Sequence, residues 1–120
     1  MDVRTLAGLR TQLETRRSTL LTATATAISG FTSHRETHSD HADTATEETD
    51  RDVNLRVHEH ERLLIRQIDA AIRRIEHGDY GHCVSCGDDI SVARLSARPT
   101  ALQCIDCQTE AERTSRRMRV

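Results

Sequence analysis

The sequence predicts a mainly α-helical protein: a long antiparallel coiled-coil hairpin followed by a small four-cysteine module and a C-terminal helix. Three observations predict this fold. Two long segments each carry one narrow apolar stripe, a polar stretch separates them, and two Cys-x-x-Cys pairs follow. Of the 120 residues, 36% are hydrophobic and only 2% aromatic. So little bulky apolar surface favours a narrow helical seam and a bound metal over a broad core.

The first segment is predicted to be a helix over residues 3–30. Leu6, Leu13, Leu20 and Ala27 recur every seven residues, as in the apolar seam of a coiled coil. The periodicity stops at Phe31, where Thr, Ser, His and acidic residues become frequent. Residues 31–46 are therefore expected to form a connecting tip.

A second helix is predicted from about Thr44 to Glu76. Thr44 and Glu47 have the spacing of a capping box, and Asp43 is also a natural N-cap. Its seam is formed by apolar residues at heptad spacing: Val57, Leu64, Ala71, Ile68 and Ile75. Gly78 is the expected C-terminal stop. The two helices are expected to fold back antiparallel, and a dimeric bundle of the same helices remains the alternative.

The four cysteines predict one structural zinc site. Cys83, Cys86, Cys104 and Cys107 form two Cys-x-x-Cys pairs separated by seventeen residues, which fits the spacing of a four-thiolate zinc finger. Four thiolates close the coordination shell and leave no position for a reacting water, so the protein is predicted not to be an enzyme. The expected domains are residues 1–79, the hairpin with its tip around 32–46, and residues 80–120, the finger with its helix.

Two other interpretations of these residue types are less favoured. A redox role for the Cys-x-x-Cys pairs needs a strand-rich setting, which the sequence lacks. His34, His38 and His41 are close in sequence, but scattered histidines in a polar chain are mostly solvated, so no second metal site is predicted. His82 adjoins Cys83 and is expected at the surface rather than on the metal.

Charge and hydropathy exclude other classes of protein. The formal net charge of −2 argues against a protein that binds nucleic acid through its overall electrostatic field. No segment has the roughly 18 apolar residues of a membrane span, and the N-terminus lacks the apolar core of a signal peptide. The expected location is the cytoplasm, where cysteines stay reduced and available to a metal.

The stretch from Cys83 to Cys107 resembles the zinc finger of the DksA/TraR family. An Ile after the first knuckle, an Arg, a Pro and the second knuckle correspond to Ile90, Arg94, Pro99 and the cysteines that follow. Val84 departs from the family, where an acidic residue or Ser is usual. The family's Asp-x-x-Asp-x-Ala tip motif matches Asp40-His-Ala-Asp43-Thr-Ala45, and the chain aligns without a gap from Asp40 to Glu112.

This resemblance implies a transcription regulator that binds RNA polymerase without contacting DNA and inserts its tip into the secondary channel. Asp40, Asp43 and Ala45 are then the polymerase-contacting residues, with Arg94 and Arg98 as a possible interface. The tip is suited to this role because residues 32–50 contain six acidic residues against one Arg, a net charge of about −5. Carboxylates on a rigid arm can reach Mg²⁺ or basic groups at the bottom of a channel.

Dependence on the alarmone ppGpp is expected to be weak or absent. Positions that are basic in the ppGpp-responsive members of the family are His60, Gln67 and Gln108 here, and only Arg98 remains. A phosphate site without fixed positive charge binds poorly.

Two competing functions remain open from the sequence. A direct DNA-binding finger needs a basic helix after the metal site, and only the tail arginines support it: Arg113, Arg116, Arg117 and Arg119. These arginines could equally clamp an acidic rim of the polymerase or form a solvated tail. A zinc-stapled coiled-coil adaptor predicts a stable dimer, whereas the polymerase-binding regulator is expected to be a monomer.

Overall fold

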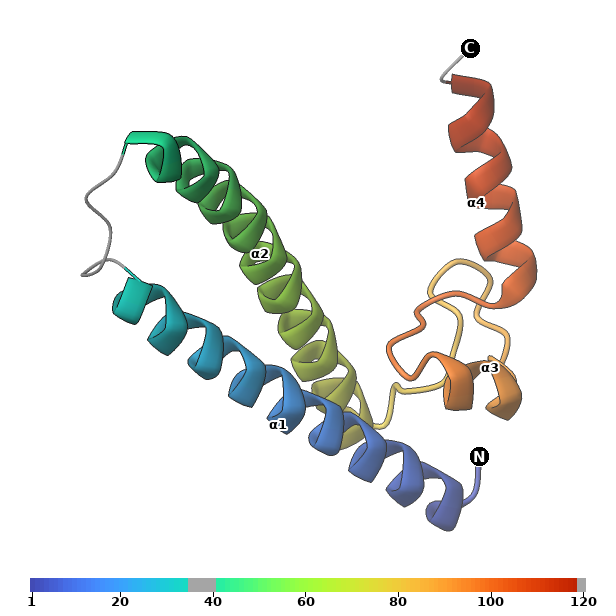
Figure 1. Cartoon of the computed structure of the whole chain (residues 1–120). Helices are drawn as coiled ribbons and strands as arrows, with labels where there is room; N and C mark the ends of the chain where they lie inside the picture. The colour runs from blue at the N-terminus through green and yellow to red at the C-terminus, as the bar shows by residue number, and fades with distance from the viewer. Residues whose placement is uncertain (35–40, 119–120) are drawn as a thin grey trace. The chain divides into compact units, whose positions relative to one another are not determined.

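The structure is a computed structural model of the chain; it describes the backbone of residues 1–34 and 41–118 and the side chains of residues 1–25 and 46–118. Its four helices are α1 (Val3–His34), α2 (His41–His77), α3 (Val92–Ala97) and α4 (Ile105–Met118), shown in Figure 1. The described backbone contains no strand, only an isolated antiparallel bridge between His82 and Asp89. This confirms the mainly α-helical fold class.

None of the helices within the described ranges is both long and apolar enough to cross a membrane. The longest, α2, carries many charged side chains along its length.

Both long helices extend further toward each other in sequence than predicted. α1 continues to His34, and α2 begins at His41 rather than at about Thr44. The capping-box prediction was therefore wrong, because Thr44 lies inside the first turn of α2. The physical reason is that Ala42 has a high helix propensity and that an acidic residue in the first turn, Asp43, is favourable near the positive end of the helix dipole.

The end of α2 confirms the predicted stop at Gly78. Gly78 has a positive φ of 81°, which a glycine adopts without the strain that a side chain would add. The Gly78 N–H donates to the carbonyl of Ile75 (3.3 Å), and the Asp79 N–H donates to that of Arg74 (2.9 Å). These two bonds form a Schellman motif, which satisfies the last carbonyls of the helix and turns the chain toward the cysteines.

The chain divides into two compact units. Unit 1 comprises Met1–Glu14 and Ile68–Val120, and unit 2 comprises Thr15–Gln67. In each unit α1 and α2 run in opposite directions, as a hairpin requires (Figure 1). From a contact in unit 1 to one in unit 2, α1 advances from Arg10 to Thr24 while α2 runs back from Glu76 to Glu61. The sequence had left this antiparallel register open.

Unit 1 contains the buried side chains of the described structure. Leu13, Ile68 and Leu95 are fully buried, and each contributes about 1.5–3 kcal/mol through the removal of apolar surface from water. The remaining buried hydrophobic residues come from both helices and from the finger: Leu9, Ala71, Tyr80, Cys83, Ile90 and Ala101. The base of the hairpin and the finger therefore share one core.

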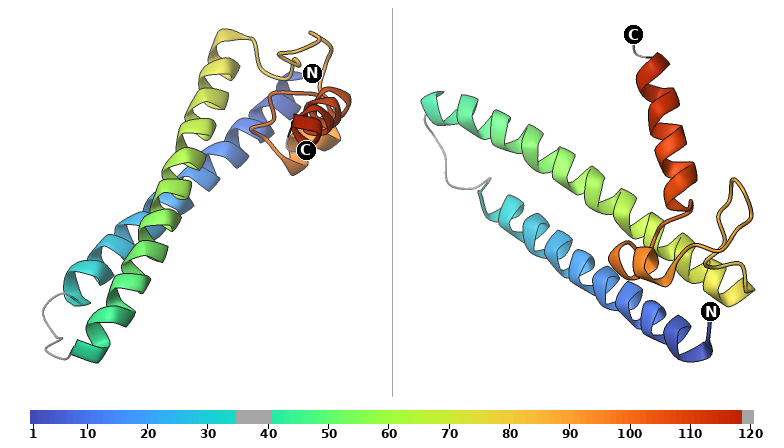
Figure 2. Two further views of the ribbon diagram at one scale, coloured as in Figure 1. Left: turned by 90° about the horizontal axis from the view of Figure 1, so that it is seen from above. Right: turned by 90° about the vertical axis from the view of Figure 1, so that its right-hand side faces the viewer.

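Polar contacts join the two helices at the base of the hairpin and attach the finger to it. The Gln12 side-chain amide in α1 donates to the carbonyl of Ser96 in α3 (3.0 Å), and Arg10 of α1 pairs with Glu76 of α2 (3.1 Å). Figure 2 shows that α3 is a short helix in a segment that is otherwise loop. Such a segment has few backbone hydrogen bonds of its own, so contacts like that of Gln12 help to position it.

Candidate metal centre

The first pair of cysteines lies on a tight turn between α2 and α3. The Gly87 N–H donates to the carbonyl of Cys83 (2.9 Å), and the Cys83 N–H donates to that of Asp88 (2.8 Å). Gly87 has a positive φ of 78°, which lets the backbone turn back directly after Cys86. The turn brings the sulfurs of Cys83 and Cys86 to the same side.

The second pair lies at the start of α4. Cys104 directly precedes the helix, and Cys107 is in its first turn. The Gln108 N–H donates to the carbonyl of Cys104 (3.0 Å), so the knuckle continues into the helix by an ordinary i, i+4 bond. The first turn of α4 is therefore part of the metal site.

Three hydrogen bonds join the two knuckles and the loop between them. The Val84 N–H donates to the carbonyl of Leu102 (2.9 Å), and the Gln103 side chain donates to the hydroxyl of Ser85 (2.8 Å). Arg94 of α3 then donates through Nε to the carbonyl of Gln103 (2.9 Å). These bonds position the two knuckles relative to each other.

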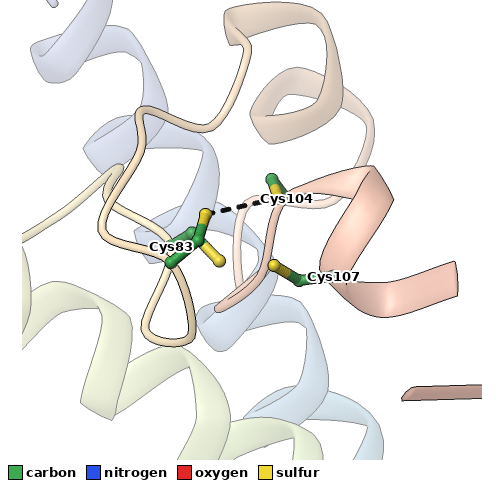
Figure 3. Close-up of side chains that lie close together, drawn as sticks. Cys83, Cys104 and Cys107 are labelled. Carbon is green, nitrogen blue, oxygen red and sulfur yellow. Dashed lines mark hydrogen bonds between the residues drawn. The ribbon is translucent and has the colours of Figure 1, made fainter. Parts of the chain in front are cut away.

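The four sulfur atoms have the geometry of a tetrahedral zinc site. All four lie within 4.8 Å of one another, and those of Cys86 and Cys104 are 3.8 Å apart. Two thiolates bound at about 2.3 Å to a tetrahedral zinc are separated by about 3.8 Å. Figure 3 shows the sulfurs of Cys83, Cys104 and Cys107 turned toward one another. The cysteines form no disulfide, and all four are positioned to bind one metal ion.

The thiols differ in acidity because their hydrogen-bond partners differ. Backbone amides, that of Cys104 first and then that of Cys86, lower the pKa of the Cys83 thiol to about 6. Hydrogen bonds between the Cys107 thiol and the neighbouring sulfurs, that of Cys104 first, raise the pKa of Cys107, because they stabilise its protonated form. A divalent metal favours deprotonation of all four thiols, because its charge stabilises the four thiolates at once.

The other predicted site residues of the finger have specific places. Arg94 is half-buried and uses its Nε inside the finger, whereas Arg98 is exposed at the C-cap of α3. His82 is exposed and contacts Asp89 through Nδ1 (2.9 Å). Within the described part of the chain, the only cluster arranged to hold a metal is the four-cysteine one.

The predicted tip is largely outside the described residues. Asp40 lies outside them, together with His38. Asp43 and Ala45 lie in the first turns of α2, as the helix bounds show, but their side chains are not among those described. The histidine group near the tip is likewise outside the described side chains.

The sequence did not reveal one residue that supports the site. Tyr80 is buried, and its hydroxyl donates to the carbonyl of Pro99 (2.7 Å), which joins the linker after α2 to the loop before the second knuckle. Burial raises the pKa of Tyr80 to about 12. A lone tyrosine in a chain this poor in aromatics is a usable signal, although the sequence does not reveal its partner.

The fold and the site together define a class: a helical hairpin protein with a structural four-thiolate zinc finger. Two family models match the chain. The prokaryotic dksA/traR C4-type zinc finger matches residues 78–113, and the N-terminal domain of the DnaK suppressor protein DksA matches residues 5–75. The chain therefore belongs to the DksA/TraR family, and its four cysteines bind one structural zinc ion.

Similar proteins cover nearly the whole chain. An RNA polymerase-binding transcription factor DksA from Caulobacter vibrioides is 39% identical over 116 residues, 97% of this chain and 82% of that protein. Its namesake from Escherichia coli K12 is 36% identical over 98% of this chain and 78% of that protein. The solved structure of transcription factor DksA2 from Pseudomonas aeruginosa has a TM-score of 0.89 at 34% identity, with coverage of 97% and 89%.

Proposed function

We propose that this protein is a transcription regulator that binds RNA polymerase directly. The observation that carries the proposal is the union, in one chain, of a helical hairpin and a four-cysteine finger that match the two DksA/TraR family models along nearly the whole sequence. The similar proteins from C. vibrioides and E. coli are named RNA polymerase-binding transcription factors, which supports the same partner here. This role assigns the protein to the cytoplasm.

The two parts of the chain are assigned different tasks. Residues 80–120 dock on the polymerase, and residues 1–79 form the hairpin whose tip enters the secondary channel. Asp40 and Asp43 supply carboxylates for polar contacts near the catalytic centre, and Ala45 allows close approach because its side chain is small. No catalytic residue is assigned to the chain itself.

Arg98 is the cation that we assign to docking in the loop region of the finger. Arg98 is exposed and free to contact an acidic surface, whereas Arg94 acts indirectly by holding the second knuckle through the carbonyl of Gln103. Unassisted DNA binding is not part of this function, since the chain carries a net charge of −2.

The experiment is a pull-down of purified bacterial RNA polymerase with the zinc-loaded protein, followed by transcription in vitro. An Asp40→Asn/Asp43→Asn double variant is compared with the wild type, and an Asp50→Asn/Asp52→Asn variant is the control, because it removes the same charge outside the tip motif. We expect all three proteins to bind and only the tip variant to lose its effect on initiation. If the tip variant retained full activity, the tip assignment would be wrong.

Addition of ppGpp to the same assay tests the expected lack of an alarmone response. With Gln67 and His60 on α2, and Gln108 on α4, in place of basic residues, we expect ppGpp to change the effect on initiation by less than about twofold. A strong enhancement by ppGpp contradicts this assignment.

An adaptor function is the alternative that one observation favours. Four large apolar side chains of α2 are between 43% and 55% exposed: Val53, Leu55, Val57 and Leu63. An adaptor would bury them in a dimer, whereas the regulator is expected to be a monomer. Light scattering distinguishes the two, and a stable dimer that fails to bind polymerase supports the adaptor.

A further inference from the structure

The described part of unit 2, which we call the hairpin arm, lacks the buried apolar seam that is present at the base of the hairpin in unit 1. Among the described residues of unit 2, Thr15–Ala25 and Thr46–Gln67, none is buried, whereas Leu13 and Ile68 at the adjoining positions of unit 1 are fully buried. Little apolar burial therefore holds α1 against α2 in this part of the arm. Regions with few buried contacts open locally at low free energy.

In the described part of unit 2, a hydrogen bond between side chains joins the two helices. The hydroxyl of Thr24 in α1 lies 2.7 Å from Oε2 of Glu61 in α2, and both residues are half-buried. A hydrogen bond to a carboxylate is roughly twice as strong as one between neutral groups. His58 lies one turn before Glu61, with its Nδ1 3.8 Å from the same oxygen, too long for a hydrogen bond.

Thr24 has a competing acceptor within its own helix. Its hydroxyl is also 2.9 Å from the carbonyl of Leu20, the bond that a mid-helix threonine usually makes. A hydroxyl has one proton, so a full bond to Glu61 is made at the expense of the bond to Leu20. The threonine can therefore satisfy its donor whether the helices are closed or apart.

We infer that Thr24 and Glu61 form a clasp that controls local opening of the hairpin arm. In the closed state the proton of Thr24 is directed to Glu61 and the helices are held together. In the open state it returns to Leu20, and Glu61 is solvated, so no buried polar group is left unsatisfied. Opening thus has a low free-energy cost, and the clasp sets how often it occurs.

Hydrogen exchange of the free, zinc-loaded protein, followed by mass spectrometry, tests the clasp. Thr24→Val keeps the shape of the side chain and removes the hydroxyl. We expect peptides from residues 15–25 and 46–67 to exchange about five to ten times faster, with no change in residues 1–14 and 68–118. Unchanged exchange in the arm, or equal acceleration in both units, overturns the inference.

Matched variants separate the clasp from a general effect on α1. Thr19→Val removes the same kind of bond within α1, from Thr19 to the carbonyl of Thr15 (3.0 Å), at an exposed position. This variant is expected to leave exchange unchanged. Thr24→Ser keeps the hydroxyl that Thr24→Val removes, so we expect the amides of the arm to exchange as slowly as in the wild type.

A double-variant cycle with Glu61→Ala tests whether the two residues act together. If the clasp exists, adding Thr24→Val to Glu61→Ala accelerates exchange no further. Fully additive effects overturn it. None of these measurements uses polymerase, so their outcome is independent of the proposed function. The consequence for transcription, a weaker effect of Thr24→Val at unchanged polymerase binding, rests on that function.

Discussion

Single side chains hold the finger together by donating to backbone carbonyls of its loops. Tyr80 donates to Pro99, Arg94 to Gln103, and Gln12 to Ser96. The finger needs these donors because its segment has only one short helix and one isolated bridge, so many carbonyls have no partner in regular secondary structure. Removing such a donor leaves a carbonyl unsatisfied, which costs more than the net value of the bond.

Tyr80→Phe is the direct test at this scale. The substitution keeps the buried ring and leaves the carbonyl of Pro99 without its donor, so we expect the free energy of unfolding of the zinc-loaded protein to fall by about 1–2 kcal/mol. Urea denaturation at neutral pH measures it. A decrease below about 0.3 kcal/mol would show that water replaces the hydroxyl without loss.

The raised pKa of Tyr80 predicts that the stabilities of the wild type and of Tyr80→Phe depend differently on pH above pH 10. The pKa of Tyr80 is raised to about 12 in the folded state, above the value near 10 of an unfolded tyrosine. Its contribution to stability is therefore complete below pH 10 and is lost as the pH rises from about 10 to 12. Wild type should converge on Tyr80→Phe in this range, as measured by thermal unfolding; parallel pH profiles would contradict the raised pKa.

At the scale of the helices, a helix end could be predicted from the sequence where the residue at that position fits only one backbone conformation. Gly78 ended α2 because only a glycine adopts its positive φ without strain. The start of α2 was mispredicted because Thr44 suits both an N-cap and a first turn, so the motif alone does not decide between them. Local signals thus predicted the helices and their order, and were ambiguous where a residue fits two roles.

A pair of glycine substitutions tests whether backbone conformation decides the role of Gly78 at the end of α2. An added Cβ meets nothing within 4 Å at either Gly78 or Gly8, so backbone conformation alone should decide the effect. Gly78→Ala places a side chain at positive φ and should destabilise the protein by about 1–2 kcal/mol. Gly8→Ala, in the interior of α1, should stabilise it by about 0.5–1 kcal/mol. Effects of the same sign in thermal unfolding would contradict the assignment.

At the scale of the whole molecule, the contacts between segments far apart in the chain could not be predicted from the sequence. Gln12 with Ser96 and Thr24 with Glu61 join residues far apart in the chain, and each side chain alone looks like an ordinary exposed polar residue. The cysteines were different, because a metal restricts the spacing of its ligands so strongly that the sequence reveals the partners. The finger could therefore be predicted as a site, but its attachment to the base of the hairpin could not.

Zinc binding is expected to weaken steeply in acid, because every ligand must bind the metal as a thiolate. The raised pKa of Cys107 means that its proton must be displaced at neutral pH, so the apparent affinity should fall at least about tenfold per pH unit between pH 7 and 6. Competition with a chromophoric chelator measures this affinity. Loss of zinc should expose the amides of residues 80–118, which depend on the site, while residues 46–67 of unit 2 keep their exchange rates, because none of the four ligands lies in that unit. An affinity independent of pH would mean that the thiolates are already formed without the metal, and acceleration in both units would mean that zinc stabilises the hairpin arm as well as the finger.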